Sequence, residues 1–405
     1  MTSRPEAPVI PSERGKCPFD PPSEYARLRE EEPISPITFR LAPKDTQGWL
    51  VTNHQHVRQI LADERFSHRN ELLATVAAPP FPMTEYAPQP AAPGFFAKMD
   101  GADHAKYRRL LAGHFTVRRI QQHEPELSQI VDETLDEMAA SGSPADLQSS
   151  FSEVVAARSV CSLLGVAPDL VSDMSEHFGA MMTLTYTLEE FIHHMESIDA
   201  ILRPMVKQRM AEPADDFFGR LVATGELTEE ELVNLAVLTV GGSLDTTPNM
   251  LSLGTFALLE HPDELAQLRA RPELYDTAVD ELLRYLTISQ LGSSRCALED
   301  VEIGGRTIKA GQTVVLSLPA ANRDPDVFAD PDRLDVTRLP RKHLALGFGE
   351  HQCLGQHLAR ATLRIGLRRL FERFPTLRLT QPADEVPLRD RAMHFGVDRL
   401  LVDWD

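Results

Sequence analysis

The longest helical pattern in the chain places the strongest constraint on its fold. Thr228 and Glu231 have the T-x-x-E spacing of a capping box, which starts a helix, and Pro262 keeps His261 out of the α conformation. The helix would span about 32 residues and roughly 48 Å, enough to cross a whole domain. Because residues 232–240 are apolar on nearly all sides, we expect a central helix surrounded by other elements.

The rest of the chain is mostly helical by pattern, with two regions of short strands. Helical patterns occupy residues 103–270 and 354–374, and strand patterns occupy residues 34–39, 48–53 and 293–318. At 405 residues the chain is long enough for two or three domains or for one large one. The pattern predicts a mainly α protein with small β-sheets, the second patch of sheet following the helices. Residues 1–21 are irregular and rich in proline.

Charge and cysteine usage exclude several classes of protein. With 41 basic and 60 acidic residues the net charge is −19, which repels phosphate backbones and anionic lipid headgroups, so we expect no nucleic-acid or membrane partner. No segment has the apolar core of a signal peptide or the roughly 18 apolar residues of a membrane helix, which favours a soluble cytoplasmic protein. The widely spaced Cys17, Cys161, Cys296 and Cys353 form no CxxC pair, which argues against disulfides and zinc knuckles.

One cysteine lies in an unusual local sequence, LGFGEHQCLG at residues 346–355, followed by an Arg-rich amphipathic helix. Gly347 and Gly349 permit positive φ angles or the close approach of a flat group, and Gly355 lets the helix lie near it. Backbone amides and the helix N-terminus favour a thiolate at Cys353, the form that binds iron through one sulfur. An isolated cysteine is more often a buried core residue, but this glycine spacing favours the ligand interpretation.

These residues resemble F-G-x-G-x-H-x-C-x-G, the haem-binding sequence of the cytochrome P450 monooxygenases, at every position but the first, where Leu346 replaces the aromatic residue. The resemblance extends over nearly the whole chain and implies one cytochrome P450 domain over residues 1–405, with the long central helix above a buried haem. It implies haem b as cofactor and Cys353 as the axial ligand of the haem iron. Gly347, Phe348 and Gly355 are then haem-contacting residues.

The resemblance also indicates which basic side chains bind the haem propionates. The segment at residues 100–108 is similar to the family's propionate-binding helix, in which a His and an Arg one turn apart face the two carboxylates. Here these are His104 and Arg108, and Arg295 and His351 occupy the matching positions for the other contacts. For each residue alone, a solvated basic side chain is the alternative.

A second short sequence that resembles the family indicates a structural ion pair. Glu281 and Arg284 resemble the family's E-x-x-R pair, and the i, i+3 spacing places both on one helical face. We expect a buried structural pair, completed by Arg333, with no catalytic role. The alternative for an isolated E-x-x-R is a surface ion pair.

The middle of the long helix has a sequence that weakens helical geometry, VGGSLDTTPN at residues 240–249. It resembles the family's oxygen-binding groove, with Gly242, Asp245 and Thr246 in register and Ser243 in place of a second glycine. An acid beside an alcohol can relay protons to bound oxygen, so Asp245 and Thr246 are the expected catalytic residues. Because Pro248 has no N–H, we predict that the helical ladder is interrupted within residues 244–249. Capping threonines without a proton role are the alternative.

Basic charge is concentrated in two stretches. Residues 340–380 carry eight Lys or Arg against two acids, and residues 101–120 carry five against one. Both are expected on the thiolate side of the haem, so we predict a docking face for an acidic electron carrier, a ferredoxin with its ferredoxin reductase. The candidate residues are Arg109, Arg118, Arg119, Arg360 and Arg364. We expect a monomer.

The segments that resemble the family's substrate-contact regions are mostly apolar, which favours a mid-sized hydrophobic natural product. The candidate lining residues are Phe81, Met83, Tyr86, Met181, Met182, Leu238, Ile288, Gln290, Met393, His394 and Phe395. The expected function is a haem-thiolate monooxygenase of secondary metabolism that hydroxylates or otherwise oxidises this substrate. Two alternatives stay open: a haem-thiolate enzyme of oxidative coupling or nitration, and a haem-binding sensor without turnover.

Overall fold

The computed structural model describes residues 9–39, 46–77, 89–167, 170–183, 187–339 and 342–405. Its α-helices are α1 (Glu24–Glu31), α2 (His54–Leu61), α3 (Gly101–Ala112), α4 (Val117–Ser141), α5 (Glu153–Leu164), α6 (Val171–Met181), α7 (Leu188–Ala211), α8 (Phe217–Ala223), α9 (Glu229–Leu244), α10 (Thr246–Glu260), α11 (Pro262–Ala270), α12 (Tyr275–Leu286), α13 (Leu318–Ala321) and α14 (Gln356–Arg373). Its strands are β1 (Ile34–Phe39), β2 (Thr46–Val51), β3 (Phe66–Ser67), β4 (Ala145–Asp146), β5 (Ser293–Ala297), β6 (Val301–Ile303), β7 (Arg306–Ile308), β8 (Thr313–Leu316), β9 (Arg378–Leu379) and β10 (Leu401–Asp403). The predicted fold class, mainly α with small sheets, is confirmed.

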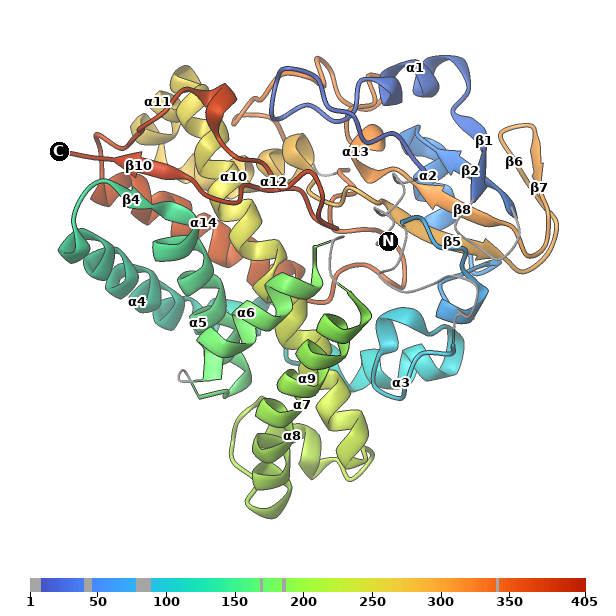
Figure 1. The fold of residues 1–405 in the computed structure, drawn as a ribbon, viewed down its shortest axis with the longest axis horizontal. Coiled ribbons are helices and arrows are strands. Elements are labelled where there is room, and N and C mark those ends of the chain that lie inside the picture. The colour runs from blue at the N-terminus through green and yellow to red at the C-terminus, as the bar shows by residue number, and fades with distance from the viewer. Residues whose placement is uncertain (1–8, 40–45, 78–88, 168–169, 184–186, 340–341) are drawn as a thin grey trace.

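The predicted central helix is present as two consecutive helices, α9 and α10 (Figure 1). The Thr228 hydroxyl accepts a hydrogen bond from the Glu231 N–H at 3.2 Å, and the Glu231 carboxylate accepts one from the Thr228 N–H at 2.8 Å, which confirms the capping box. The helix is interrupted at Asp245, whose φ of −108° departs from helical geometry. The predicted interruption is therefore confirmed.

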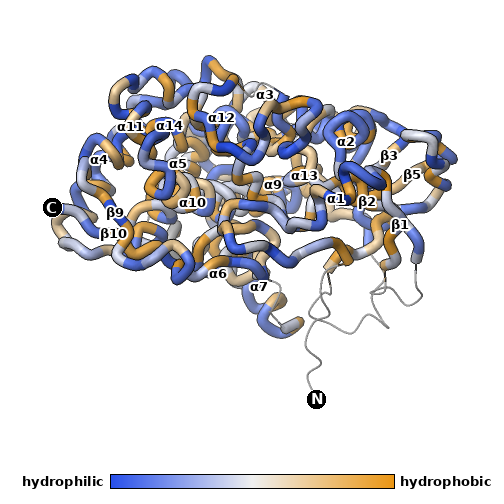
Figure 2. Tube along the Cα trace, turned by 90° about the horizontal axis from the view of Figure 1, so that it is seen from above, coloured by the Kyte–Doolittle hydropathy of each residue, from blue (hydrophilic) through white to orange (hydrophobic). Residues whose placement is uncertain are grey.

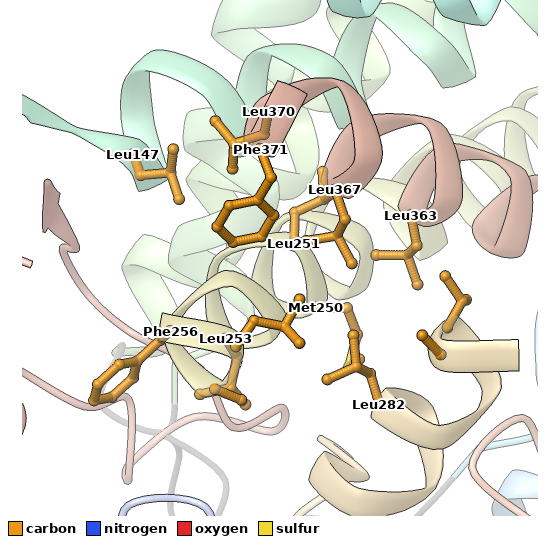
Figure 3. Close-up of a cluster of buried hydrophobic side chains, with 14 of the residues drawn as sticks. Leu147, Met250, Leu251, Leu253, Phe256, Leu282, Leu363, Leu367, Leu370 and Phe371 are labelled. Atoms are coloured by element: carbon orange, nitrogen blue, oxygen red, sulfur yellow. The ribbon is translucent and has the colours of Figure 1, made fainter. Parts of the chain in front are cut away.

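An apolar cluster fixes α10 between α14 and α12 (Figure 3). Leu251 on α10 points toward Leu367 on α14, and Leu282 on α12 lies across from them. A Cβ at Gly366 would come within 2.9 Å of a Leu251 methyl carbon, so the missing side chain allows α10 and α14 to pack closely. Since α14 follows the cysteine loop and α10 follows the Asp245 break, this core sets the distance between the two halves of the site.

The main sheet joins strands from both ends of the chain. Its order is β1-β2-β8-β5-β3, and β2 pairs with β8 in parallel, with Trp49 opposite Val314. The expectation of a separate second patch of sheet is thus wrong for β5 and β8, although β6 and β7 form a hairpin of their own. All four residues of β8 are buried, as a strand in the middle of a covered sheet requires.

Several of the long helices lie at the opposite end of the molecule from the main sheet, whereas α1, α2 and α13 lie beside the sheet (Figure 2). Figure 2 shows α4, α10, α11 and α14 at one end and β1, β2, β3 and β5 at the other, with α9 between them. In the part of the chain that the structure describes, no helix is long and apolar enough to cross a membrane.

Candidate functional site

The cysteine loop holds Cys353 directly before α14. The Cys353 N–H donates to the Leu346 carbonyl at 2.9 Å, and Gly347 and Gly349 turn the loop with φ angles of 70° and 77°. Burial raises the pKa of the Cys353 thiol, and the Gly355 amide and the charge of Arg108 oppose this shift without outweighing it. The Gly355 amide and the Arg108 charge thus act in the predicted direction, toward the thiolate. A metal cation bound at the sulfur would favour the thiolate further.

Two cavities of about 640 and 280 Å³ meet at Cys353. Gly242 on α9 and Cys353 line both of them, so the cavities separate the helix from the cysteine loop. A Cβ added at Gly242 or at Gly355 would meet no atom within 4 Å, which leaves room for a broad flat group between the two elements. The space and the sulfur donor together fit an iron porphyrin.

Basic side chains gather at one edge of these cavities. His68, Lys98, His104, Arg108 and His351 line them. Burial lowers the pKa of Lys98 to about 8 and that of His104 to about 4. The excess of cationic and donor groups suits a ligand with two carboxylates, such as the porphyrin propionates.

Two acids, Asp100 and Glu350, lie among these bases, and Asp100 is the one that forms hydrogen bonds there. The Asp100 carboxylate accepts from the His351 Nε2–H at 3.2 Å and from the Ser67 hydroxyl. Burial by itself would raise the pKa of Asp100, but these hydrogen bonds outweigh it and lower the pKa to about 2. Asp100 therefore stays ionised and fixes the ring of His351. The centroid of this ring lies 4.2 Å from the centroid of the His104 ring.

Two predicted haem contacts lie outside the described walls of both cavities. Arg295 is buried, its Nη1 donates to the Ser293 hydroxyl and the Ser294 carbonyl, and burial lowers its pKa to about 10. Phe348 lies under the guanidinium of Arg58 at 4.3 Å. The loop turns at Gly347 and Gly349, so the intervening side chain points away from the cavity toward α2. His104, Arg108, His351 and Gly355 line the smaller cavity.

The other wall of the site contains the break between α9 and α10. Asp245 is only 2% exposed, and its carboxylate accepts hydrogen bonds from Arg389 at 3.0 Å and from the His394 Nδ1–H at 2.6 Å. Burial alone would raise the pKa of Asp245, but the His394 ring and the Arg389 charge outweigh it and lower the pKa. Asp245 is thus a carboxylate that is buried, ionised and fixed in place.

Thr246 faces the cavities from the next position. Its hydroxyl donates to the Gly242 carbonyl at 2.7 Å, and Thr246 lines both cavities. The hydroxyl oxygen keeps lone pairs that can accept a further hydrogen bond from the cavity side. Asp245 and Thr246 therefore present an ionised acid and an alcohol at adjacent positions, opposite Cys353.

The E-x-x-R pair is completed by a different arginine from the one predicted. Glu281 and Arg284 are fully buried and form a bidentate ion pair, with both oxygen–nitrogen distances at 2.8 Å. The third member is Arg338, whose Nε donates to Glu281 at 3.0 Å. The prediction of Arg333 is wrong for its side chain, which is 67% exposed; its backbone carbonyl instead accepts from Arg284 at 3.2 Å.

The predicted substrate-lining residues divide into three groups. Phe81, Met83 and Tyr86 lie outside the described residues. The 640 Å³ cavity is lined by Ile288, Met393 and His394, and the smaller one by Leu238.

The remaining four predicted residues lie away from the described cavity walls, which corrects the prediction. They are Met181, Met182, Gln290 and Phe395. Gln290 instead uses its side-chain amide to donate to the Ala392 carbonyl at 2.9 Å. Phe395 is 1% exposed and packs in the core. Successive side chains of an extended segment point to opposite sides, so Phe395 points away from the cavity that His394 faces.

Sequence reasoning missed four residues of the site: His68, Lys98, Asp100 and Arg389. His68 follows the short strand β3, and Lys98 ends a turn of 3₁₀ helix, so neither has a helical neighbour at motif spacing. Asp100 is the first residue of the segment that resembles the propionate-binding helix, and its position directly before α3 is the one signal that could have identified it. Arg389 reaches the site from a loop far along the chain, which no local pattern indicates.

Comparisons with known proteins agree with this geometry. Residues 180–398 match the family described as Cytochrome P450. Cytochrome P450 105C1 of Streptomyces sp is 41% identical over 404 residues, covering 98% of this chain and 99% of the relative. Pentalenic acid synthase of Streptomyces avermitilis is 39% identical over 404 residues, covering 98% of each chain. The crystal structure of CYP105P1 in complex with filipin I superposes with a TM-score of 0.90 at 37% identity and covers 99% of each chain. The structure of mycinamicin VIII C21 methyl hydroxylase MycCI of Micromonospora griseorubida superposes with a TM-score of 0.88 at 32% identity. This match covers 96% of this chain and 98% of the other.

Proposed function

The chain belongs to the cytochrome P450 family and is a haem-thiolate monooxygenase, and we propose that it hydroxylates a mid-sized hydrophobic natural product in secondary metabolism. One observation carries the proposal: Cys353 faces Thr246 and the Asp245 break across a cavity of about 640 Å³. Relatives whose names state a reaction include pentalenic acid synthase, vitamin D3 dihydroxylase, Nocardicin C N-oxygenase and mycinamicin VIII C21 methyl hydroxylase, which supports oxidation of an organic compound of this kind.

The residues around the cavity hold the cofactor in one orientation. Haem b, when bound through a cysteine thiolate, supplies an iron that activates O₂ with two electrons and oxidises a C–H bond of the substrate. The thiolate of Cys353 would hold the iron, and His104 and Arg108 would bind the propionates. Haem and substrate together would fill the cavities between α9 and the cysteine loop and so displace bulk water from them.

Proton delivery is the role proposed for Asp245 and Thr246. His394 lines the cavity and holds a proton on Nδ1, which is hydrogen-bonded to the Asp245 carboxylate. Asp245 can accept this proton as another enters the ring at Nε2 from solvent, and the carboxylate must then leave its contact with His394 to release the proton toward the cavity. Thr246, at the next position, can accept a hydrogen bond from the cavity side, and it can pass its proton to the cavity when its hydroxyl turns from the Gly242 carbonyl.

The test combines spectra with product analysis. In the reduced protein with carbon monoxide, we expect the absorption band of a thiolate-ligated haem. A panel of hydrophobic natural products is then screened for a ligand-induced spin shift, and turnover with the best ligand is analysed by mass spectrometry. A product heavier by one oxygen atom supports the proposal, whereas a coupled dimer or a nitrated product contradicts it.

A Thr246→Ala variant separates hydroxylation from coupling or nitration. If hydroxylation depends on proton delivery, this variant consumes reductant but releases peroxide in place of product. Unchanged product formation would favour the alternative chemistry.

Electrons are proposed to come from a ferredoxin and its reductase. A groove of about 160 Å³ runs between α4 and the start of α14, close to Cys353, and Arg360 and Arg364 line it. Arg109, Arg360 and Arg364 are already ion-paired, with Glu226, Asp280 and Glu124 respectively. Among the described residues, Arg118 and Arg119 on α4 are exposed beside this groove and have no ion pair, so they are the better contacts for an acidic carrier.

We further propose that the chain acts as a monomer in the cytoplasm and as one functional domain. The long-range pairing of β2 with β8 supports the single domain, because it ties both ends of the chain into one sheet.

A further inference from the structure

A cluster of three histidines lies outside the catalytic cavities, where α6 and α7 pack together (Figure 1). His177 comes from α6, and His193 and His194 are consecutive residues of α7. Their ligand nitrogens all lie within 4.8 Å of one another, and the Nδ1 atoms of His177 and His194 are 2.9 Å apart. None of the three is among the described residues that line the two cavities at Cys353.

We propose that His177, His193 and His194 form a binding site for Zn²⁺. Three imidazoles with an open fourth position are an established donor set for zinc, and imidazole suits late first-row divalent cations in general. Zinc–nitrogen bonds of about 2.0 Å in a tetrahedron place the nitrogens about 3.3 Å apart, so the 2.9 Å pair needs to open by only a few tenths of an ångström. His193, which is exposed, can reach the same ion by rotating its ring.

The surroundings of the cluster favour a cation. Because the Nδ1 atoms of His177 and His194 are hydrogen-bonded at 2.9 Å, one of them carries no proton and keeps the lone pair that a metal needs. Glu190 and Glu176 lie near enough for their negative charges to act on the His194 ring. Without a cation, the two Nδ1 atoms share one proton and the third ring has no role in the pair.

Zinc at this site would tie α6 to α7. The end of α6 contacts the segment that lines the catalytic cavity, because the Met182 carbonyl accepts from the Met393 N–H at 3.0 Å. The ion would thus restrain one flank of the cavity without touching it. The proposal does not depend on the substrate of the monooxygenase.

The test uses the haem-loaded protein, treated with a chelator and titrated with ZnCl₂ by calorimetry. We expect one Zn²⁺ per chain, a higher melting temperature, and slower amide hydrogen exchange in α6 and α7. A His194→Gln variant should bind Zn²⁺ about 100-fold more weakly, since even the loss of an outer-shell partner costs up to that factor. A His123→Gln variant, which removes a histidine of α4 paired with Glu126, should bind like the parent protein.

Two results would overturn the proposal. One is equal Zn²⁺ affinity in the parent and the His194→Gln variant, and the other is the absence of saturable binding in the parent. MgCl₂, an ion that prefers oxygen ligands, should give no binding, and binding equal to that of Zn²⁺ would also contradict the site. If His194→Gln fails to fold, judged by its carbon-monoxide band, the exposed His193→Gln is used in its place and must show the same weakening.

Discussion

The carboxylate of Asp245 and the imidazole of His394 are 2.6 Å apart, although 149 residues separate them in the chain. The pair links the break between α9 and α10 to a segment near the C-terminus. Because the carboxylate can only accept a hydrogen bond, the Nδ1 of His394 must carry the proton between them. The two side chains therefore form a proton-holding unit at the edge of the cavity.

Replacing Asp245 by Asn should lower turnover about 100-fold, within the usual range for loss of an acid–base group. The amide keeps the size of the side chain but cannot take up the His394 proton. Haem content and substrate-induced spin shift should be unchanged, and the measurement is product formed per reductant consumed. An Asp398→Asn variant is the control, since its carboxylate is 63% exposed and 4.0 Å from Arg389. Equal turnover in both variants would show that Asp245 has no proton role.

Exchanging Cys353 for Ser should abolish the thiolate-type carbon-monoxide band. A serine hydroxyl has no comparable affinity for iron, so the protein should also lose monooxygenase activity. A Cys17→Ser variant is the control because Cys17 is a free cysteine outside the described cavity walls. If the band survives in Cys353→Ser, another residue is the iron ligand.

A Glu281→Gln variant should lose about 3–5 kcal/mol of stability, because it leaves the buried guanidinium of Arg284 without its counter-charge. Arg338 loses the same partner. The measurement is the urea midpoint of unfolding of the haem-loaded protein. By contrast, Arg333→Ala should change stability by no more than about 0.5 kcal/mol, since that side chain is exposed. A large loss in Arg333→Ala would restore the role that the sequence assigned to this residue.

The free energy of unfolding should fall as the solution becomes acidic, and part of this fall should come from Glu231. Burial alone would raise the pKa of Glu231, but hydrogen bonds from Lys106, the Thr228 N–H and Tyr107 outweigh it and lower the pKa from 4.5 to about 2. A depressed pKa stabilises the fold above pH 4.5, and this contribution is lost as the pH falls from about 4.5 toward 2.

A Glu231→Gln variant tests this origin of the acid sensitivity. Glutamine can still close the capping box, so the variant removes the charge and keeps the cap. It should be less stable by about 2 kcal/mol at pH 7, and its urea midpoint should depend less on pH between 4.5 and 2. If the urea midpoint depends on pH equally in both proteins, the acid sensitivity comes from other carboxylates.

Reversing charge at Arg118 and Arg119 should slow carrier-driven reduction at low ionic strength. The double Arg118→Glu, Arg119→Glu variant replaces two exposed cations beside the α4–α14 groove, so a complementary acidic carrier should associate more slowly and with a weaker dependence on salt. Stopped-flow reduction by a ferredoxin measures the rate. Arg399→Glu, an exposed reversal elsewhere on the surface, is the control and should leave the rate unchanged. Equal rates in the two variants would remove this face as the docking site.

Local patterns predicted the parts of this protein in which function depends on near neighbours in sequence. The capping box, the turns around Cys353, the break before Pro248 and the Glu281–Arg284 pair each lie within a few residues. The structure also brings together groups that tertiary contacts alone make adjacent, such as Arg389 with Asp245 and His68 with Lys98. Whether Arg333 or Arg338 reaches Glu281 depends on the path of an irregular segment, which hydrophobic periodicity does not determine.

The parallel pairing of β2 with β8 has a consequence for biosynthesis. As the chain leaves the ribosome, β1 and β2 can form their hairpin early, but the free edge of β2 stays open until residues 313–316 have been made. An open edge can pair with another nascent chain. Premature termination between β2 and β8 would therefore yield a fragment with an unpaired strand edge, which is prone to aggregate.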